Sequence, residues 1–368
     1  MVIYPPCRPE TGSTLTMFHH EPPRATAIHH EEPMSRENSR IRISTLDEPG
    51  VTLEEMIRDV KAGLSREPKD LSTSPKYLYD AEGSRIFEEI TETPEYYQTD
   101  AEFSILRQRS EEIVSRTGCR TLVELGSGSS SKTRALLDAL LESGGPARYA
   151  PLDVSESALE ESGEQLASRY PDLDIQGYVG DFDKSLRSLL KSAENGSGGR
   201  LVVLLGGTIG NFSPESRRGF LRTLRESMGE GDHLLIGVDL VKPRETLERA
   251  YDDAAGATAR FNKNLLSVLN HNLEANFDPE LFAHRAAYDE PHQRVEMWLD
   301  SLEDQEVKLP ALGMDVRFEK GEGLRTEISA KFTRESAAGM FEDTAFHMLD
   351  LYTDPDELFG LTLAAPKG

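Results

Sequence analysis

Short apolar runs alternate with amphipathic stretches through the middle of the chain. The runs are rich in Val, Leu and Ile, as buried strands are, and the stretches between them repeat apolar residues three and four positions apart, as helices do. The predicted strands are 121–125, 148–153, 174–180, 200–206 and 233–239, and the predicted helices are 131–143, 155–169, 183–194 and 213–228. Strands and helices that alternate in this order form a mostly parallel sheet with helices on both faces, which is a doubly wound α/β fold.

The pattern changes after residue 241. A long polar helical stretch covers 245–274, and strand-like runs follow at 294–302, 306–309, 314–319 and 324–332. A helical region followed by a meander of antiparallel strands indicates an inserted α+β domain. The last residues contain one helical run and two strand-like runs, which we expect to return to the first sheet as an edge hairpin.

These patterns predict three parts of the chain. Residues 1–48 are rich in proline and charge and show no sustained periodicity, so we predict a disordered extension there. Residues 102–240 together with 333–368 are predicted to form the domain of the first sheet. Residues 49–101 together with 241–332 are predicted to form a second domain, which we expect to bind substrate.

The composition excludes several classes of protein. The 368 residues include 41 basic and 65 acidic ones, and the formal net charge of −24 argues against a general phosphate-binding surface. We therefore expect a small substrate and no nucleic-acid partner. No run approaches the roughly 18 apolar residues of a membrane span, and no secretion signal precedes the first domain, so we expect no membrane association. Cys7 and Cys119 provide no disulfide framework, which fits the reducing cytoplasm. We expect a monomer, although nothing in the sequence reports the oligomeric state.

Two histidine pairs in the extension are candidates for metal ligands. His19 and His20 precede Glu-Pro-Pro, and His29 and His30 precede Glu-Glu-Pro. Paired histidines on a chain without fixed geometry bind metal weakly. We therefore predict no metal site.

The run Val-Glu-Leu-Gly-Ser-Gly-Ser-Ser-Ser-Lys-Thr-Arg, residues 123–134, predicts a site for a nucleoside cofactor. Gly126 and Gly128 allow a tight turn and a close approach to a ligand, and the helix that follows directs free amide groups toward it. A dinucleotide site would have a third glycine where Ser131 stands, and the spacing of a P-loop is absent. An acid about 25 residues further on, Asp153, suits a ribose diol. The combination favours S-adenosylmethionine.

Other predicted strand ends supply the rest of this cofactor site. Gly126 can admit the methionine part, Lys132 can neutralise its carboxylate, and Asp153 can accept hydrogen bonds from the ribose hydroxyls. Asp181 offers an acceptor for the adenine amine, and Phe182 offers an apolar face. Asp153 alone is as readily a turn residue. Because the carboxyl ends of parallel strands share one edge, the residues together are a stronger signal.

Seven segments on both predicted domains carry a resemblance to a known family. They are Pro75–Asp80, Thr93–Tyr97, Val123–Arg134, Gly207–Phe212, Ala250–Asp253, Glu296–Trp298 and Thr326–Phe332. Together they resemble the L-histidine Nα-methyltransferases of ergothioneine biosynthesis, over roughly residues 50–368. The resemblance implies a class I methyltransferase fold and the transfer of three methyl groups from S-adenosylmethionine to the α-amino nitrogen of free L-histidine, giving hercynine.

The resemblance also implies which residues contact histidine. These are Tyr96, Asn211, Tyr251, Met297, Glu327 and Ser329. Asn211 and Tyr251 can donate hydrogen bonds to the substrate carboxylate. Glu327 and Ser329 stand two apart in a predicted strand, so both side chains point to one face, where a carboxylate and a hydroxyl can contact both imidazole nitrogens.

Aromatic residues are expected to wall the pocket. Tyr79 and Tyr96 are the predicted walls, with Tyr97 equally plausible from sequence alone, while Met297 packs on the imidazole and Trp298 is expected in the core. We assign no general base; Tyr79 and a bound water are the candidates that could assist loss of a proton from the substrate amine.

Two other functions remain open at this stage. The chain could methylate another aromatic amino acid, such as tryptophan, or bind the cofactor as a regulator without turnover. Each residue also has a structural interpretation, since a tyrosine is often core packing, Glu327 could face solvent and Asn211 could cap the next helix.

Overall fold

The structure, a computed structural model, describes residues 41–46, 52–193 and 198–367. Residues 40–368 form one compact unit. The histidine pairs and most of the predicted extension lie outside the described residues. None of the described helices is long and apolar enough to cross a membrane.

Part of the predicted disordered extension is a strand. Residues Ile41–Thr45 form β1, which pairs in parallel with β5 (Leu173–Val179). Ile41 and Ile43 alternate with polar residues and lie against Gly163 and Gly177 of the neighbouring helix and strand. The prediction of disorder was wrong here because a five-residue alternation is hard to recognise beside a proline-rich segment.

The larger sheet has eight strands in the order β1-β5-β4-β3-β6-β7-β14-β13. Its parallel strands, besides β1 and β5, are β3 (Cys119–Leu125), β4 (Ala147–Asp153), β6 (Gly199–Leu204) and β7 (His233–Asp239). The antiparallel hairpin β13 (Phe346–Thr353) and β14 (Phe359–Pro366) closes the edge beside β7. The predicted doubly wound sheet and its edge hairpin are confirmed.

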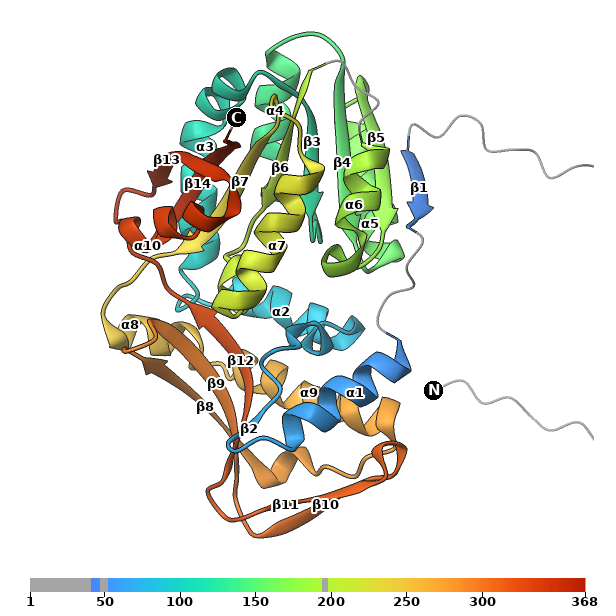
Figure 1. The fold of residues 1–368 in the computed structure, drawn as a ribbon, viewed down its shortest axis with the longest axis vertical. Coiled ribbons are helices and arrows are strands. Elements are labelled where there is room, and N and C mark those ends of the chain that lie inside the picture. The colour runs from blue at the N-terminus through green and yellow to red at the C-terminus, as the bar shows by residue number, and fades with distance from the viewer. Residues whose placement is uncertain (1–40, 47–51, 194–197, 368) are drawn as a thin grey trace, which may run out of the picture. The chain divides into compact units, whose positions relative to one another are not determined.

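Helices pack on both faces of this sheet (Figure 1). On one face the core includes residues of α3 (Gln98–Thr117), α4 (Arg134–Glu142) and α5 (Glu156–Arg169). The core of the other face includes residues of α6 (Phe182–Ser192), α7 (Pro214–Ser227) and α10 (Arg334–Gly339). Because both faces are covered, the central strands are almost continuously apolar, as the sequence pattern required.

A smaller sheet of four strands has the order β2-β12-β9-β8. Its strands are β2 (Lys69–Asp70), β8 (Phe282–Asp289), β9 (Arg294–Ser301) and β12 (Gly323–Ala330). The helices α1 (Leu53–Leu64), α2 (Ala81–Thr91), α8 (Arg244–Ala250) and α9 (Ala257–Leu273) contribute to the same hydrophobic core. The four predicted strands are present, but they do not form a meander, because β9 pairs with β12 and not with the strand that follows it in sequence. Strand β8 was missed because its alanines and half-buried positions give no clear alternation.

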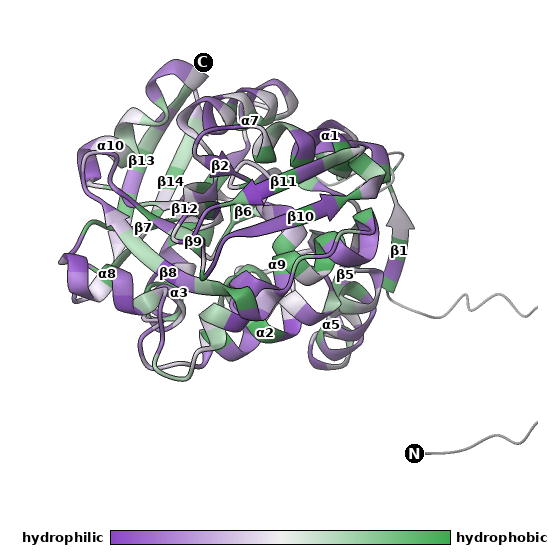
Figure 2. Cartoon of the chain, turned by 90° about the horizontal axis from the view of Figure 1, so that it is seen from below, coloured by the Kyte–Doolittle hydropathy of each residue, from purple (hydrophilic) through white to green (hydrophobic). Residues whose placement is uncertain are grey.

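A separate hairpin, β10 (Gln305–Leu309) and β11 (Met314–Phe318), follows β9. Its residues alternate between buried and exposed, and Figure 2 shows the hydrophilic residues along both strands. The alternation is that of a hairpin with one face on the core. The division into two domains stays a prediction.

The two sheets meet where β7 and β12 end. Leu240 and Phe332 form a parallel bridge, and the amide of Phe332 donates to the carbonyl of Asp239 at 2.8 Å. The short helix η2 (Thr208–Asn211) lies against both strands. A Cβ on Gly210 would lie 2.9 Å from the carbonyl oxygen of Ala330, so only glycine permits this close approach. The carboxyl edge of the larger sheet therefore faces β12.

Candidate active site

The glycine-rich loop after β3 is tied to the end of β4. Gly126 and Gly128 have φ values of 70° and 48°, in the left-handed region that glycine adopts without strain. The amide of Gly126 donates to the carbonyl of Leu152 at 2.8 Å, and the amide of Gly128 donates to Oδ2 of Asp153 at 2.8 Å. Nothing lies within 4 Å of a Cβ built on Gly128. The loop therefore leaves open space beside the Asp153 carboxylate.

A cluster of buried polar side chains holds this loop in place. Glu124 accepts hydrogen bonds from the hydroxyls of Thr133 and Tyr149, and the Tyr149 hydroxyl lies 2.8 Å from Oγ of Ser130. Burial raises the pKa of Glu124 to about 7, although both hydrogen bonds act in the opposite direction. Because these partners come from β3, β4 and the loop itself, the cluster fixes the shape of the loop at the carboxyl edge of the larger sheet.

Lys132 contacts a carboxylate that was not identified from sequence. Its Nζ donates to Oε2 of Glu102 at 2.8 Å, and Glu102, fully buried on α3, also accepts from the amide of Gly206 at 2.9 and 3.0 Å. Glu102 thus joins the loops that follow β3 and β6. A lysine has three N–H donors, so this contact leaves two of them for a cofactor carboxylate.

Asp181 and Phe182 lie at the end of β5, as predicted. Asp181 is buried and its Oδ2 is 3.7 Å from Nζ of Lys76. The ring of Phe182 packs against Phe212 and Phe220 at centroid distances of 6.2 and 6.0 Å. A Cβ on Gly126 would lie 3.9 Å from the same ring. These groups fit the polar and apolar parts of S-adenosylmethionine. They comprise an open glycine turn, two carboxylates, an ammonium and an apolar face.

A β-bulge turns Glu327 toward η2. Along β12 and β9 the register pairs Arg325 with Trp298 and then Glu327 with Met297, so Thr326 is the extra residue. Residues directly opposite in an antiparallel pair share a face. Without the bulge Thr326 would stand opposite Met297, and every later side chain of β12 would point to the other face. The bulge therefore sets which side chains of β12 face η2 and the carboxyl edge of the larger sheet.

Glu327 is held by Asn211. The amide Nδ2 of Asn211, at the end of η2, donates to Oε1 of Glu327 at 2.9 Å, and the Glu327 side chain is buried. Burial raises the pKa of Glu327 to about 7, and the positive charge of Lys331 only partly offsets this. Asn211 was expected to bind the substrate carboxylate; here one of its two N–H donors serves Glu327 and the other is left for a ligand.

Ser329 and Tyr251 meet at a buried lysine. The Tyr251 hydroxyl donates to Oγ of Ser329 at 2.8 Å and accepts from Nε2 of Gln98 at 3.0 Å. Nζ of Lys331 donates to the Tyr251 hydroxyl at 2.8 Å and to Ser329 at 2.9 Å. Lys331 and Gln98 were not identified from sequence. The period of two that links Glu327 with Ser329 would have reached Lys331 in one more step.

Lys331 is balanced by Asp239 at the end of β7. The Lys331 ammonium lies 2.7 Å from Oδ2 of Asp239, and the Lys242 ammonium lies 2.6 Å from Oδ1. The Tyr97 hydroxyl donates to the same carboxylate at 2.9 Å. Burial pushes the pKa of Asp239 upward, but the two ammonium groups outweigh it and hold that pKa below its usual value. Asp239 ends a parallel strand, as Asp153 does. The position at a strand end that identified Asp153 and Asp181 in the sequence would therefore also have identified Asp239.

Aromatic side chains pack beside these groups. The ring of Tyr96 meets that of Tyr251 edge to face at 6.4 Å, and Tyr79 packs against Phe87 and Phe261 at 5.5 and 5.2 Å. Burial raises the pKa of both Tyr79 and Tyr96 well above 10. Each therefore keeps its proton at neutral pH, which favours a role as wall or donor over one as base. Tyr97, the alternative wall, is instead engaged by Asp239.

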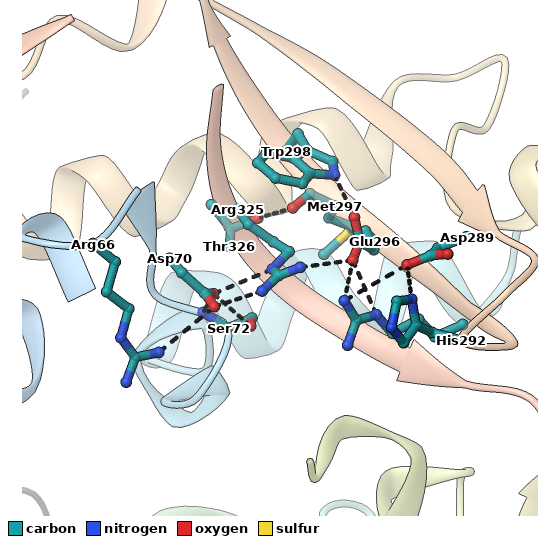
Figure 3. Close-up of polar contacts among 11 residues, drawn as sticks. Arg66, Asp70, Ser72, Asp289, His292, Glu296, Met297, Trp298, Arg325 and Thr326 are labelled. Atoms are coloured by element: carbon teal, nitrogen blue, oxygen red, sulfur yellow. Dashed lines mark hydrogen bonds and ion pairs between the residues drawn. The ribbon is translucent and has the colours of Figure 1, made fainter. Parts of the chain in front are cut away.

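The opposite face of the smaller sheet carries a charged network (Figure 3). Glu296 accepts from Nε1 of Trp298 at 3.1 Å, from Arg325 at 2.7 Å and from Arg294 at 2.5 Å. Arg325 also pairs with Asp70 of β2 at 2.6 Å. The expectation of Trp298 in the core was wrong: it is half-buried on this face because it alternates with Met297. The network anchors β12 beside the bulge.

Comparisons with known proteins give consistent results. A family model described as a histidine-specific, SAM-dependent methyltransferase matches residues 56–366. A histidine N-alpha-methyltransferase of Mycolicibacterium smegmatis is 45% identical over 311 residues, which are 84% of this chain and 95% of that protein. Ergothioneine biosynthesis protein 1 of Schizosaccharomyces pombe is 33% identical over 58% of this chain and 28% of that protein. An L-tryptophan methyltransferase of Psilocybe serbica is 29% identical over 74% of this chain and 82% of that protein.

The position of Asp153 predicts its effect on cofactor affinity. We expect Asp153→Ala to weaken S-adenosylmethionine binding about tenfold or more, because the variant lacks the carboxylate that we expect to accept from the ribose. Calorimetric titration measures this, with Asp172→Ala, an exposed aspartate before β5, as the control. Unchanged affinity in Asp153→Ala would show that the ribose binds elsewhere.

The raised pKa of Glu327 predicts a pH-dependent stability difference. Between its unfolded value of 4.5 and its folded value of about 7, the folded state retains a proton that the unfolded state releases, so the wild type loses stability as pH rises through this window. Glu327→Gln removes the loss and should be more stable at pH 8 by up to about 3 kcal/mol, with a smaller gain at pH 5. Urea denaturation at both pH values tests this, beside Glu303→Gln at an exposed site. A gain of equal size at both pH values would contradict it.

Proposed function

This chain belongs to the family of histidine-specific, S-adenosylmethionine-dependent methyltransferases, and from that premise we propose that it methylates the α-amino nitrogen of free L-histidine three times, giving hercynine in the first step of ergothioneine biosynthesis. The resemblance inferred from the sequence is confirmed. The observation that carries the choice of substrate is the pair Glu327 and Ser329, buried side by side on the crevice face of β12. A carboxylate and a hydroxyl in this arrangement can satisfy both nitrogens of an imidazole.

The remaining groups suit the rest of the substrate. We assign the second N–H of Asn211 and the hydroxyl of Tyr251 to the α-carboxylate, because both can donate hydrogen bonds. Met297, opposite Glu327 in the sheet, is assigned to the flat face of the imidazole. We assign Gly126, Lys132, Asp153, Asp181 and Phe182 to the cofactor.

For methyl transfer the protein mainly has to align the substrate amine with the methyl group and exclude water. S-adenosylmethionine, when bound, supplies a methyl group on a sulfonium that a neutral amine can attack in line. The half-buried ring of Tyr79 and the buried ring of Tyr96 remove water around the amine, which disfavours its charged form. The same aromatic faces can accept the fixed positive charge of a trimethylated product. We propose that Tyr79 acts as a wall and that the protein works as a cytoplasmic monomer.

A panel of acceptors tests the proposed function. The purified protein is incubated with S-adenosylmethionine and each free amino acid, and mass spectrometry follows gains of one, two or three methyl groups. We expect three methyl groups on histidine alone. Methylation of tryptophan in preference to histidine would indicate the substrate of the Psilocybe relative, and no turnover of any amino acid would indicate a regulator.

Glu327→Ala tests the assignment of the imidazole site. We expect histidine affinity to fall about tenfold or more, because a buried charge-assisted hydrogen bond is lost, while affinity for S-adenosylmethionine stays nearly unchanged. Calorimetric titration with each ligand measures both, and Glu303→Ala is the exposed control. If histidine binds Glu327→Ala as tightly as wild type, the imidazole lies elsewhere.

A further inference from the structure

The buried ammonium of Lys331 is the part of this site to which neither the sequence resemblance nor the proposed function gives a role. Its side chain is fully buried, and its three N–H donors have three acceptors: the hydroxyl of Tyr251, Oγ of Ser329 and Oδ2 of Asp239. An ammonium group only donates. Both hydroxyls must therefore accept from it, and neither can direct its own proton toward Lys331.

The hydrogen bonds of Tyr251 fix the direction of its proton. A phenol oxygen accepts two hydrogen bonds at most. Here both are donated by N–H groups, Nε2 of Gln98 at 3.0 Å and Nζ of Lys331 at 2.8 Å. The single Tyr251 proton is left for an acceptor, which in this structure is Ser329. Among the described residues, none accepts a hydrogen bond from Ser329. A carboxylate that entered the site would be a stronger acceptor than the neutral Ser329 hydroxyl.

The backbone of Tyr251 is fixed as well. Its carbonyl accepts from Nε2 of His284 at 2.8 Å, and Nδ1 of the same ring lies 2.9 Å from Nδ2 of Asn262. Asn262 and His284 are held in α9 and β8, which belong to the core of the smaller sheet. The Tyr251 hydroxyl therefore has a fixed position, and its proton has a fixed direction.

The charge behind this hydroxyl is also suited to an anion. Lys331 and Lys242 carry two positive charges against the single negative charge of Asp239, and all three side chains are buried. The Asp354 carboxylate also acts on Lys242, and Glu327 lies within reach of the charge of Lys331. The positive charge next to Tyr251 is therefore that of the Lys331 ammonium itself, in a place that water screens little. An anion that accepts a hydrogen bond from Tyr251 would be separated from the Lys331 ammonium only by the Tyr251 hydroxyl.

We propose that Lys331 is a positioning residue that makes the site selective for substrates with a free α-carboxylate, by holding the Tyr251 hydroxyl as a donor and by placing its own ammonium charge behind it. The inference rests on the proposed function, since it concerns the carboxylate of the same amino acid. When the carboxylate accepts the hydrogen bond from the Tyr251 hydroxyl, Ser329 still accepts from Lys331, and the Ser329 hydroxyl can donate to a bare imidazole nitrogen. One buried lysine thus sets the donor direction of two hydroxyls.

Histamine isolates the carboxylate, because it keeps the imidazole and the amine of histidine and lacks only that group. The affinities of histidine and histamine are measured by calorimetry on wild type and Lys331→Met, each saturated with S-adenosylhomocysteine. Wild type is expected to prefer histidine at least about tenfold, and Lys331→Met to weaken histidine about tenfold or more while changing histamine less than about threefold. Equal losses for both ligands would overturn the proposal, since they would indicate a general structural role.

Two further variants keep the test decisive. Asp239 retains Lys242 and Tyr97 in Lys331→Met, so the buried carboxylate stays paired and the variant is expected to fold. Gln98→Leu removes the other donor to Tyr251 without changing a charge, and a smaller loss of the same preference is expected. Lys191→Met, at an exposed position of α6, is the control.

A double-mutant cycle distinguishes action through Tyr251 from an independent effect. If Lys331 acts through the Tyr251 hydroxyl, the losses of histidine affinity in Lys331→Met and Tyr251→Phe are not additive. Additive losses would overturn the proposal even if each single variant binds weakly. If wild type binds no histidine, the proposed function fails together with this inference, whereas wild type that methylates histidine but shows equal affinity for histamine refutes the inference alone.

Discussion

The buried carboxylate of Asp239 can remain ionised only because two lysines approach it from different parts of the fold. Lys242 follows β7 directly, and Lys331 follows β12 of the smaller sheet. A buried charge without partners costs several kcal/mol (about 3–5 when one partner is removed), so the ends of β7 and β12 must stay together. This requirement joins the edge of the larger sheet to which we assign the cofactor with the strand to which we assign the substrate residues. The main-chain bridge between Leu240 and Phe332 reinforces the junction.

The order of side chains along β12 follows from one irregularity. The bulge at Thr326 turns Glu327 toward Asn211 of η2, and the period of two then places Ser329 and Lys331 on the same face. The next partner, Asp239, lies on the other sheet. A carboxylate with a raised pKa, a hydroxyl and an ammonium therefore stand in sequence along one strand, which gives the site opposite charges at its two ends. A substrate with a basic ring and an anionic group matches this polarity.

The sequence predicted what depends on local periodicity and strand order. Asp153, Asp181 and the glycine turn were found because carboxyl ends of parallel strands converge, and the structure places them as that rule requires. What it did not predict depends on contacts between distant segments. Glu102 is a buried acid on a helix, and only the fold shows that it holds Lys132 and the Gly206 amide. Strand β8 was missed because its half-buried alanines have no clear period, and Trp298 was misplaced because an aromatic residue was assumed to face the core.

The most direct test of this account is a crystal structure of the protein with L-histidine and S-adenosylhomocysteine. We predict that the imidazole nitrogens contact Glu327 and Ser329 and that the α-carboxylate accepts from Tyr251 and Asn211, with Lys331 still within hydrogen-bond distance of Tyr251. A histidine bound in the reverse direction, with its carboxylate beside Glu327 or its ring at Tyr251, would contradict the account.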